Sequence, residues 1–476
     1  MPSSSALVWF RNDLRVSDHP ALTAAAASGL PLLCLYILDV ESPGLRPPGG
    51  ASRWRLDRAL AALEADLAAR GGKLHFLRGS AERLLPDVAR AARADKIFWS
   101  RRYGGAEIAL DTRLKAALRE SGREVRSFSA SLLAEPWQVK SKSGGGFKVF
   151  TPFWRALREK IGPQAPLPAP PALVAAPWPG EAPEPLAREA LALAPAKPNW
   201  AKDFPDPDAG EAGAQKRLLE FLDRKVASYP AHRDRLDLDG TSRLSAHLHF
   251  GEISPRRIFA AAPPSSGGDK FLAELGWREF SYHLLHAHPE LSWRNFNPRF
   301  DDFPYRKDEA ALEAWRRGKT GYPVVDAALR ELWTTGHMHN RARMIVASFL
   351  AKHLLIDWRE GEKFFWDALA DADEANNAAS WQWVAGCGAD AAPYFRIFNP
   401  VLQGEKFDPD GAYVRRFCPE LAGLPAACIH KPWAAPEAVL AEAGVRLGET
   451  YSEPILDHDF ARRRALDALA AVARGR

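Results

Sequence analysis

Four short segments of the chain combine hydroxyl, carboxylate, amide and guanidinium groups closely enough to form a binding site. In the first, residues 239–245 (DGTSRLS), a loop is expected to enter a helix, and its hydroxyls and free N–H groups would meet the positive end of the helix dipole. Such a site suits a phosphate, but a Thr-Ser pair before a helix is also the common N-cap. Both interpretations stay open, and the cap is the commoner outcome.

The other three segments place charged and amide groups on expected helices or just before them. Glu274 and Arg278 stand four residues apart beside Trp277, as a surface ion pair or as part of a binding face. Residues 340–344 (NRARM) suit an anionic ligand, although a solvated basic face explains them equally well. Residues 371–377 (DADEANN) mix carboxylates with amides, which favours hydrogen bonding to a polar heterocycle over metal binding.

Cysteines and histidines do not form a standard metal site. The cysteines stand at 34, 387, 418 and 428 with no CxxC pair, and the histidines at 247, 249, 283, 286, 288, 337 and 339 lack the usual ligand spacing. We expect reduced structural thiols and no metal.

The composition narrows the class of protein. Of 476 residues, 46% are hydrophobic, which excludes disordered and collagen-like chains. The net charge of +5 fits an anionic partner but also an ordinary, slightly basic protein. Sixteen tryptophans suit the stacking of bases or ring cofactors. With no leader-like start and no apolar stretch of membrane-spanning length, the sequence predicts a cytoplasmic protein without a membrane partner.

Two domains and a linker are expected to position these segments. Strand-length apolar runs alternate with helical patterns over residues 1–130, which predicts an α/β, Rossmann-like domain with a doubly wound parallel sheet. No GxGxxG follows the first strand, so the usual dinucleotide fingerprint is absent. Residues 131–215, Pro- and Ala-rich from 163 to 207, predict a long linker, and residues 216–476 predict a larger all-α domain. The strands are expected at 6–10, 32–38, 74–77, 96–99 and 125–128, and the helices from His19 and over 53–70, 81–94 and 107–120.

Taken in this order, the segments resemble one family, the DNA photolyases and cryptochromes, which are flavoproteins driven by blue light. The resemblance covers nearly the whole chain and is most like a class I cyclobutane pyrimidine dimer photolyase. It is carried by residues 8–15 (VWFRNDLR), 148–153 (KVFTPF), 320–327 (TGYPVVDA) and 394–400 (YFRIFNP). It implies an N-terminal antenna domain and a C-terminal helical domain that binds FAD, in agreement with the expected domains.

The resemblance also implies a set of cofactor residues. Asn377 would face the N5 edge of the flavin, where a neutral amide can accept the N5–H hydrogen bond and favour FADH⁻. Arg343 would pair with Asp371 beside the ring. Trp381, Trp358 and Trp315 match the family's chain of electron-relay indoles from flavin to surface. The remaining FAD contacts would be Tyr229, Thr241, Ser242, Arg243, Leu244, Ser245, Asp371 and Asp373.

The resemblance implies a second set of residues, which would bind UV-damaged DNA. A pyrimidine dimer has lost its stacking, so flipping it into a pocket is easier than flipping sound bases. Trp277 and Trp383 would wall that pocket, and Glu274 would stabilise the radical anion formed on the lesion. The full set is Arg233, Glu274, Trp277, Arg278, Asn340, Arg341, Met344, Trp383 and Gln403. Enzymes that repair the (6-4) photoproduct carry histidines where Asn340 and Met344 stand, so the cyclobutane dimer is the expected substrate.

Two positions depart from the family pattern. His337 stands where Trp is usual, and Ala106 replaces an Asn that contacts the folate antenna in some members, although Glu107 is kept. Because Glu107 and residues 147–153 resemble members that use folate, we expect methenyltetrahydrofolate as the antenna. An 8-hydroxy-5-deazaflavin in a deep cleft of the α/β domain is the other option.

Three functions compete. The first is a monomeric deoxyribodipyrimidine photo-lyase, the second a blue-light photoreceptor of the cryptochrome type, and the third a nonphotochemical oxidoreductase. Asn377 stands where plant receptors have Asp, and the chain ends soon after Arg474 without the long tail of many signalling cryptochromes. These features favour DNA repair. The oxidoreductase would need the dinucleotide fingerprint that the sequence lacks.

Overall fold

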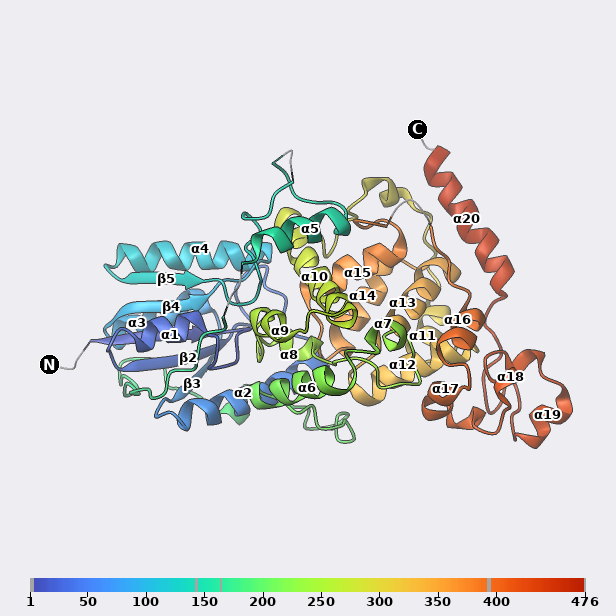
Figure 1. The fold of residues 1–476 in the computed structure, drawn as a ribbon, viewed down its shortest axis with the longest axis horizontal. Helices are drawn as coiled ribbons and strands as arrows, with labels where there is room; N and C mark the ends of the chain where they lie inside the picture. Colours follow the sequence, from blue (N-terminus) through green and yellow to red (C-terminus); the bar gives the residue numbers. More distant parts are fainter. Residues whose placement is uncertain (1–3, 142–143, 163–164, 392–394, 475–476) are drawn as a thin grey trace.

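The structure, a computed structural model, describes residues 4–141, 144–162, 165–391 and 395–474. Tyr394, the first residue of the YFRIFNP motif, lies outside the described residues. An α/β domain occupies the N-terminal end of the molecule, and a larger helical domain occupies the rest (Figure 1).

Five parallel strands form the sheet of the α/β domain, in the order β3-β2-β1-β4-β5. Alternate residues of β1 face opposite sides, so Val8 packs with α1 and α2 while Trp9 packs with α3 and α4. The doubly wound α/β fold predicted from the sequence is therefore confirmed. The strands are β1 (Ser5–Phe10), β2 (Leu32–Leu38), β3 (Leu74–Arg78), β4 (Ala94–Ser100) and β5 (Glu124–Phe128), and the helices are α1 (Pro20–Ala26), α2 (Gly50–Ala68), α3 (Ala81–Ala91) and α4 (Gly105–Glu120).

The ends of these helices differ from prediction by a few residues. Helix α3 stops at Ala91 instead of residue 94 because Arg93 adopts a φ of +46°, a left-handed conformation that a helix cannot continue through, and β4 begins at Ala94.

The linker predicted over residues 131–215 contains a helix that the sequence interpretation missed. Helix α5 (Phe150–Lys160) packs closely on α10, and a Cβ added at Gly276 of α10 would lie 2.5 Å from the Trp154 ring. Among the described residues of the proline-rich stretch, a 3₁₀ turn at Arg188–Leu191 and two isolated β-bridges, from Ala175 and Leu186, hold the chain along the sheet. The segment is therefore packed structure and not a free spacer.

The helical domain begins at Glu211, a few residues before the predicted position 216. Its largest core surrounds the buried Trp315 and Trp358. No helix among the described residues is both long and apolar enough to cross a membrane. The helices are α6 (Glu211–Arg224), α7 (Tyr229–His232), α8 (Ser245–His249), α9 (Pro255–Ala261), α10 (Ser266–Ala287), α11 (Glu309–Arg316), α12 (Pro323–Thr335), α13 (Asn340–Ser348), α14 (Trp358–Ala368), α15 (Glu374–Ala385), α16 (Pro400–Phe407), α17 (Ala412–Phe417), α18 (Ala426–Ile429), α19 (Glu437–Glu442) and α20 (His458–Arg474). A π-helical turn (Phe349–His353) follows α13, and 3₁₀ turns lie at Pro298–Asp302, Pro419–Leu421 and Pro432–Ala434.

The VWFRNDLR motif joins the two domains. Arg15 is buried and donates to the backbone oxygens of Gly251 (2.8 Å) and Ala130 (2.9 Å), and Leu14 N donates to Phe250 O. Asp18, just beyond the motif, pairs with Arg256 of α9 at 2.8 Å. Buried charged groups with several partners at a domain boundary fix the relative position of the domains.

Candidate functional site

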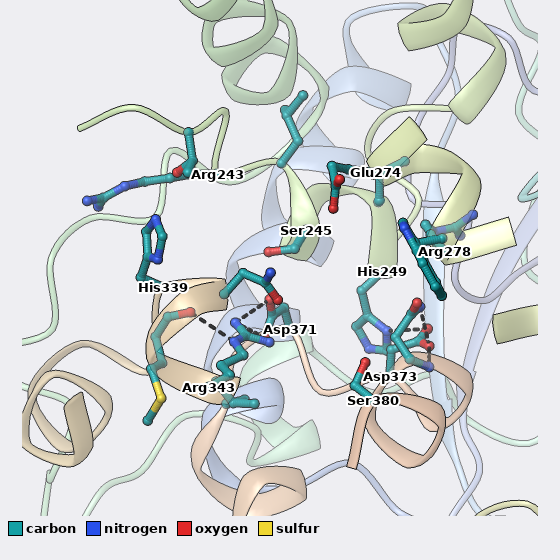
Figure 2. Close-up of a pocket in the computed structure, with 18 of the residues that line it drawn as sticks. Arg243, Ser245, His249, Glu274, Arg278, His339, Arg343, Asp371, Asp373 and Ser380 are labelled. Atoms are coloured by element: carbon teal, nitrogen blue, oxygen red, sulfur yellow. Dashed lines mark hydrogen bonds and ion pairs between the residues drawn. The ribbon is translucent and has the colours of Figure 1, made fainter. Parts of the chain in front are cut away.

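The helical domain encloses a cavity of about 350 Å³, lined by residues of α7, α8, α10, α13 and α15 among others. We call it the main cavity because most of the expected site residues line it, and Figure 2 shows part of this lining. This volume lies within the usual range for small-molecule sites. All the residues that the resemblance assigned to FAD line it: Tyr229, Thr241, Ser242, Arg243, Leu244, Ser245, Arg343, Asp371, Asp373 and Asn377.

The loop before α8 does not cap the helix with its hydroxyls. The N-cap of α8 is Leu244, which has no side-chain cap, and Thr241 and Ser242 line the main cavity. Arg243 turns the chain between them with a φ of +52°. The helix-cap interpretation of this segment is therefore wrong, because α8 begins at Ser245, beyond both hydroxyls, and leaves them beside the cavity.

The expected ion pair between Arg343 and Asp371 is present. Arg343 Nη2 lies 2.8 Å and 3.0 Å from the two Asp371 oxygens, and its Nε donates to Met338 O (Figure 2). Burial alone would raise the pKa of Asp371, but the Arg343 guanidinium holds that pKa below its usual range. The cavity wall therefore carries a fixed positive charge matched by a buried carboxylate.

Asp373 has a structural role that sequence reasoning missed. It is the N-cap of α15, accepting from Asn376 N at 2.8 Å, and it also accepts from the Tyr282 hydroxyl. His249 Nδ1 lies 3.5 Å away. Although burial opposes ionisation, the His249 ring, the Arg278 charge and the Tyr282 hydroxyl keep the pKa of Asp373 well below its usual range. Asp373 thus orders the floor of the cavity as well as lining it.

Asn377 is held by its nitrogen, which leaves its oxygen for a ligand. Its Nδ2 donates to the Glu362 carboxylate at 2.8 Å and to the Glu362 backbone oxygen at 3.1 Å. Its Oδ1 accepts no hydrogen bond from any described residue, and the side chain is 8% exposed in the cavity wall. An oxygen so placed can accept a hydrogen bond from a ring N–H.

The three tryptophans of the expected relay are all buried. Trp381 lines the main cavity, and its Nε1 has no partner among the described residues. Trp315 lies directly beside it, with ring centroids 6.2 Å apart, and is fully buried. Trp358 is also fully buried and donates to Asn295. The prediction that Trp315 ends the relay at the surface is therefore wrong. Phe364 contacts both the Trp315 ring and the Trp333 ring, and Trp333 is 47% exposed.

Six of the nine expected DNA residues also line the main cavity: Arg233, Glu274, Trp277, Arg278, Asn340 and Met344. Glu274 of α10 lines it (Figure 2). Its carboxylate pairs with Arg233 and, at 3.5 Å, with Lys270. Arg341 and Gln403 instead line a neighbouring hollow.

Trp383 does not line the main cavity as predicted. It borders a small adjacent cavity and donates to Asp390 O at 3.1 Å. The aromatic ring that supports Trp277 is Phe150, whose centroid lies 3.9 Å away with the planes 8° apart. Phe150 belongs to the KVFTPF motif inside the expected linker. That motif was the sequence signal that could have identified Phe150 as a site residue. His337, the departure from Trp, does line the main cavity.

A second cavity of about 170 Å³ lies at the carboxyl ends of β1 and β2, where doubly wound sheets bind ligands. Ala106 and Glu107 line it, as do Arg46 and Trp366. Glu107 also caps α4 and lies 3.3 Å from Arg102. Residues 147–153, expected beside the antenna, do not line this cavity.

Glu374 in this second cavity gives a testable pH dependence. Burial and, next, the Glu107 carboxylate raise the pKa of Glu374 to about 7. Because the folded-state value lies above the ordinary one, the contribution of Glu374 to stability is present below about pH 4.5 and is lost as the pH rises through about 7. Glu374→Gln can still accept from Ser292, and we expect it to raise the free energy of unfolding by roughly 1–3 kcal/mol at about pH 8 and little near pH 4.5. Urea unfolding of both proteins at both pH values measures this difference. An equal effect of the substitution on the free energy of unfolding at the two pH values would contradict it.

Comparison with known proteins agrees with this geometry. The DNA photolyase family matches residues 6–172, and the FAD binding domain of DNA photolyase matches residues 271–471. A deoxyribodipyrimidine photo-lyase of Agrobacterium fabrum is 52% identical over 480 residues, 99% of each chain. Cryptochrome-1 of Arabidopsis thaliana is 38% identical over 98% of this chain and 70% of its own length. The crystal structure of a bacterial class III photolyase from Agrobacterium tumefaciens has a TM-score of 0.95 and 50% identity, covering 100% of this chain and 98% of that one.

These matches confirm the family expected from the sequence motifs. The expected likeness to class I photolyases is not confirmed, because the solved structure just described is that of a class III photolyase. The first matched region contains nearly all of the α/β domain, and the second lies in the helical domain. The chain is thus a photolyase-type enzyme and belongs to the DNA photolyase and cryptochrome family of FAD-binding proteins.

Proposed function

We propose that the protein repairs cyclobutane pyrimidine dimers in DNA by light-driven electron transfer from FADH⁻. The observation that carries this proposal is that one cavity is lined both by the expected FAD residues and by six of the expected DNA residues. A cofactor and a flipped lesion held in the same cavity would be close enough to exchange an electron without large motion of the protein.

The residues present fit FAD on two observations. Trp381 Nε1 is a buried polar atom beside the main cavity without a partner among the described residues, and the side-chain hydrogen bonds that Asn377 makes to described residues use only its Nδ2. The hydroxyls of Thr241 and Ser242 suit the phosphates. When bound in reduced form, FAD supplies the electron under blue light. Asn377 holds the proton at N5 by accepting its hydrogen bond, and Arg343 balances the negative charge of the flavin.

The lesion would be bound by Trp277 and Glu274. Because Trp277 is stacked on Phe150, its ring is held rigid before the substrate arrives, which lowers the entropy lost on binding. Glu274 can hydrogen-bond a pyrimidine and stabilise the charge that develops on it. Neither Asn340 nor Met344 can donate a proton as histidine does, which favours the cyclobutane dimer over the (6-4) product.

The second cavity is our proposed antenna site, with methenyltetrahydrofolate as the chromophore and 8-hydroxy-5-deazaflavin as the alternative. Glu107 and Glu374 offer carboxylates to ring N–H groups there. The proposal includes a monomer that acts on UV-damaged DNA in the cytoplasm. To distinguish the two chromophores, each is added separately to FAD-loaded protein and the excitation spectrum for repair is recorded.

Arg341 should carry a phosphate contact of the DNA. It lies 2.8 Å from Asp234, so Arg341→Ala both removes a cation and leaves a carboxylate facing the DNA. We expect weaker binding to damaged DNA and a salt slope reduced by about 1. Binding measured over a range of salt concentrations tests this. Arg90→Ala, an exposed arginine of α3 in the α/β domain, is the control and should keep the original slope; an equal change in both variants would refute the contact.

A cryptochrome-type photoreceptor is the second candidate, favoured by the 38% identity to Cryptochrome-1. Both functions require flavin photoreduction, but repair alone requires light-dependent loss of dimers. FAD-loaded protein that photoreduces and leaves dimer-containing DNA intact would favour the photoreceptor.

A further inference from the structure

The loop before α2 connects the α/β domain to the amide of Asn377 through two side chains. Arg46 donates to both carboxylate oxygens of Glu362, at 2.7 Å and 3.0 Å. Glu362 in turn accepts from Asn377 Nδ2 at 2.8 Å. The three residues therefore form one continuous chain of charge-assisted hydrogen bonds that crosses the domain boundary.

Arg46 is held in place from several sides. Its guanidinium stacks on the Trp366 ring at 4.0 Å from the centroid, and the Trp366 indole donates to Pro47 O. Further along the loop, Gly50 N donates to Asp367 at 2.8 Å. A Cβ at Gly49 would lie 2.1 Å from Trp366 O, so the loop approaches α14 as closely as backbone can. This docking makes Arg46 a preorganised partner for Glu362.

Glu362 depends on that partner. Its side chain is 3% exposed, and Arg46 is the cation that donates to both of its oxygens. A buried charge without a partner is costly, so without Arg46 the carboxylate is expected to turn toward the water of the second cavity, which Arg46 lines. A Glu362 carboxylate that has turned away no longer accepts from Asn377 Nδ2. Asn377 would then keep only its bond to the Glu362 backbone oxygen, and its amide would lose its single orientation.

We propose that Arg46 is a positioning residue for the flavin, acting through Glu362 to keep Asn377 Oδ1 turned toward N5. The inference rests on the proposed function, since it needs FAD in the main cavity. An oxygen at N5 favours the reduced ring, which carries N5–H, over the oxidised ring, which has no hydrogen there. The α/β domain thereby contributes to the redox state of a cofactor that it does not touch.

The test is the two-electron midpoint potential of FAD-loaded protein, titrated anaerobically against reference dyes. Arg46→Met is expected to weaken the preference for reduced over oxidised flavin about tenfold, the size of one hydrogen bond, which corresponds to about 30 mV of lower potential. The double variant Arg46→Met/Glu362→Gln removes one positive and one negative charge together, so comparing it with Arg46→Met separates lost hydrogen bonding from a change in net charge. Arg58→Met is the matched control: Arg58 also stacks on a tryptophan of the α/β domain, Trp54, and does not contact Glu362.

A rescue variant separates positioning from a general loosening of the domains. In Arg46→Met/Glu362→Gln, the neutral amide introduced at position 362 can accept from Asn377 without a cation, so the potential should return to the original value. If Arg46→Met does not load FAD, Arg46→Lys should lower the potential in the same direction by less. An unchanged potential in these single variants, or no rescue, overturns the inference alone. Failure of the unsubstituted protein to bind FAD overturns the proposed function and this inference together.

Discussion

Replacing Arg343 with methionine is expected to lower the free energy of unfolding by about 3–5 kcal/mol, because it leaves a buried charge without its partner. Asp371 is 4% exposed, and Arg343 provides both of its short contacts, at 2.8 Å and 3.0 Å. The same change removes the positive charge from the cavity wall, so FAD should also be lost on gel filtration. Urea unfolding and the flavin absorbance of the eluted protein measure the two effects.

The partner variant Asp371→Asn distinguishes a broken ion pair from lost packing. Asparagine keeps the shape of the side chain and leaves no buried negative charge, so its effect on stability should be clearly smaller than that of Arg343→Met. In the double variant the effects should be far from additive, since the two residues share one interaction. If the two single variants lose equal stability and their losses add in the double variant, the pair contributes only side-chain volume to the site.

Replacing Glu274 with alanine is expected to lower the yield of dimer repair per absorbed photon by on the order of tenfold to a hundredfold, with FAD still bound. Glu274 lies in the main cavity on α10, away from the Arg343–Asp371 pair on α13 and the loop before α15. Its carboxylate is already held by Arg233, so it is preorganised to stabilise charge on the lesion. Repair yield, measured by single-turnover illumination, tests this together with the flavin spectrum.

Two further variants sharpen the Glu274 experiment. Glu274→Gln keeps the size of the side chain and one hydrogen-bonding oxygen, so it should repair better than the alanine variant. Lys270→Met removes the other ion pair of Glu274, at 3.5 Å, and should have a small effect because Lys270 does not line the cavity. Full repair by Glu274→Ala would exclude any part of this carboxylate in the reaction.

The sheet was predictable because its strands β1 and β2 are buried along their whole length, and buried parallel strands are continuous apolar runs. Helix α5 was missed because Ser-Gly-Gly-Gly and proline-rich sequence surround it, and its stability comes from tertiary packing, as at Gly276 on Trp154. The early end of α3 depends on a left-handed residue, Arg93, that no composition signal marks. Such local features follow from tertiary contacts and not from periodicity.

The candidate site was predictable mainly through the family resemblance. The spacing of residues 239–245 alone favoured a helix cap, which the later start of α8 contradicts. Likewise, tryptophan content could not show that Trp315 is buried beside Trp381, because burial depends on how α11 packs against α12 and α14. Phe150 and Arg46 were missed because each acts through a residue far away in sequence, Trp277 and Glu362 respectively.

The most direct test of the account is to illuminate FAD-loaded, prereduced protein with two synthetic oligonucleotides, one carrying a cyclobutane thymine dimer and one carrying a (6-4) photoproduct. Each is separated from its repaired form by chromatography, with dark samples as controls. We predict light-dependent conversion of the cyclobutane dimer to two intact thymines and no conversion of the (6-4) product. Conversion of both lesions, or of neither while the flavin still photoreduces, would contradict it.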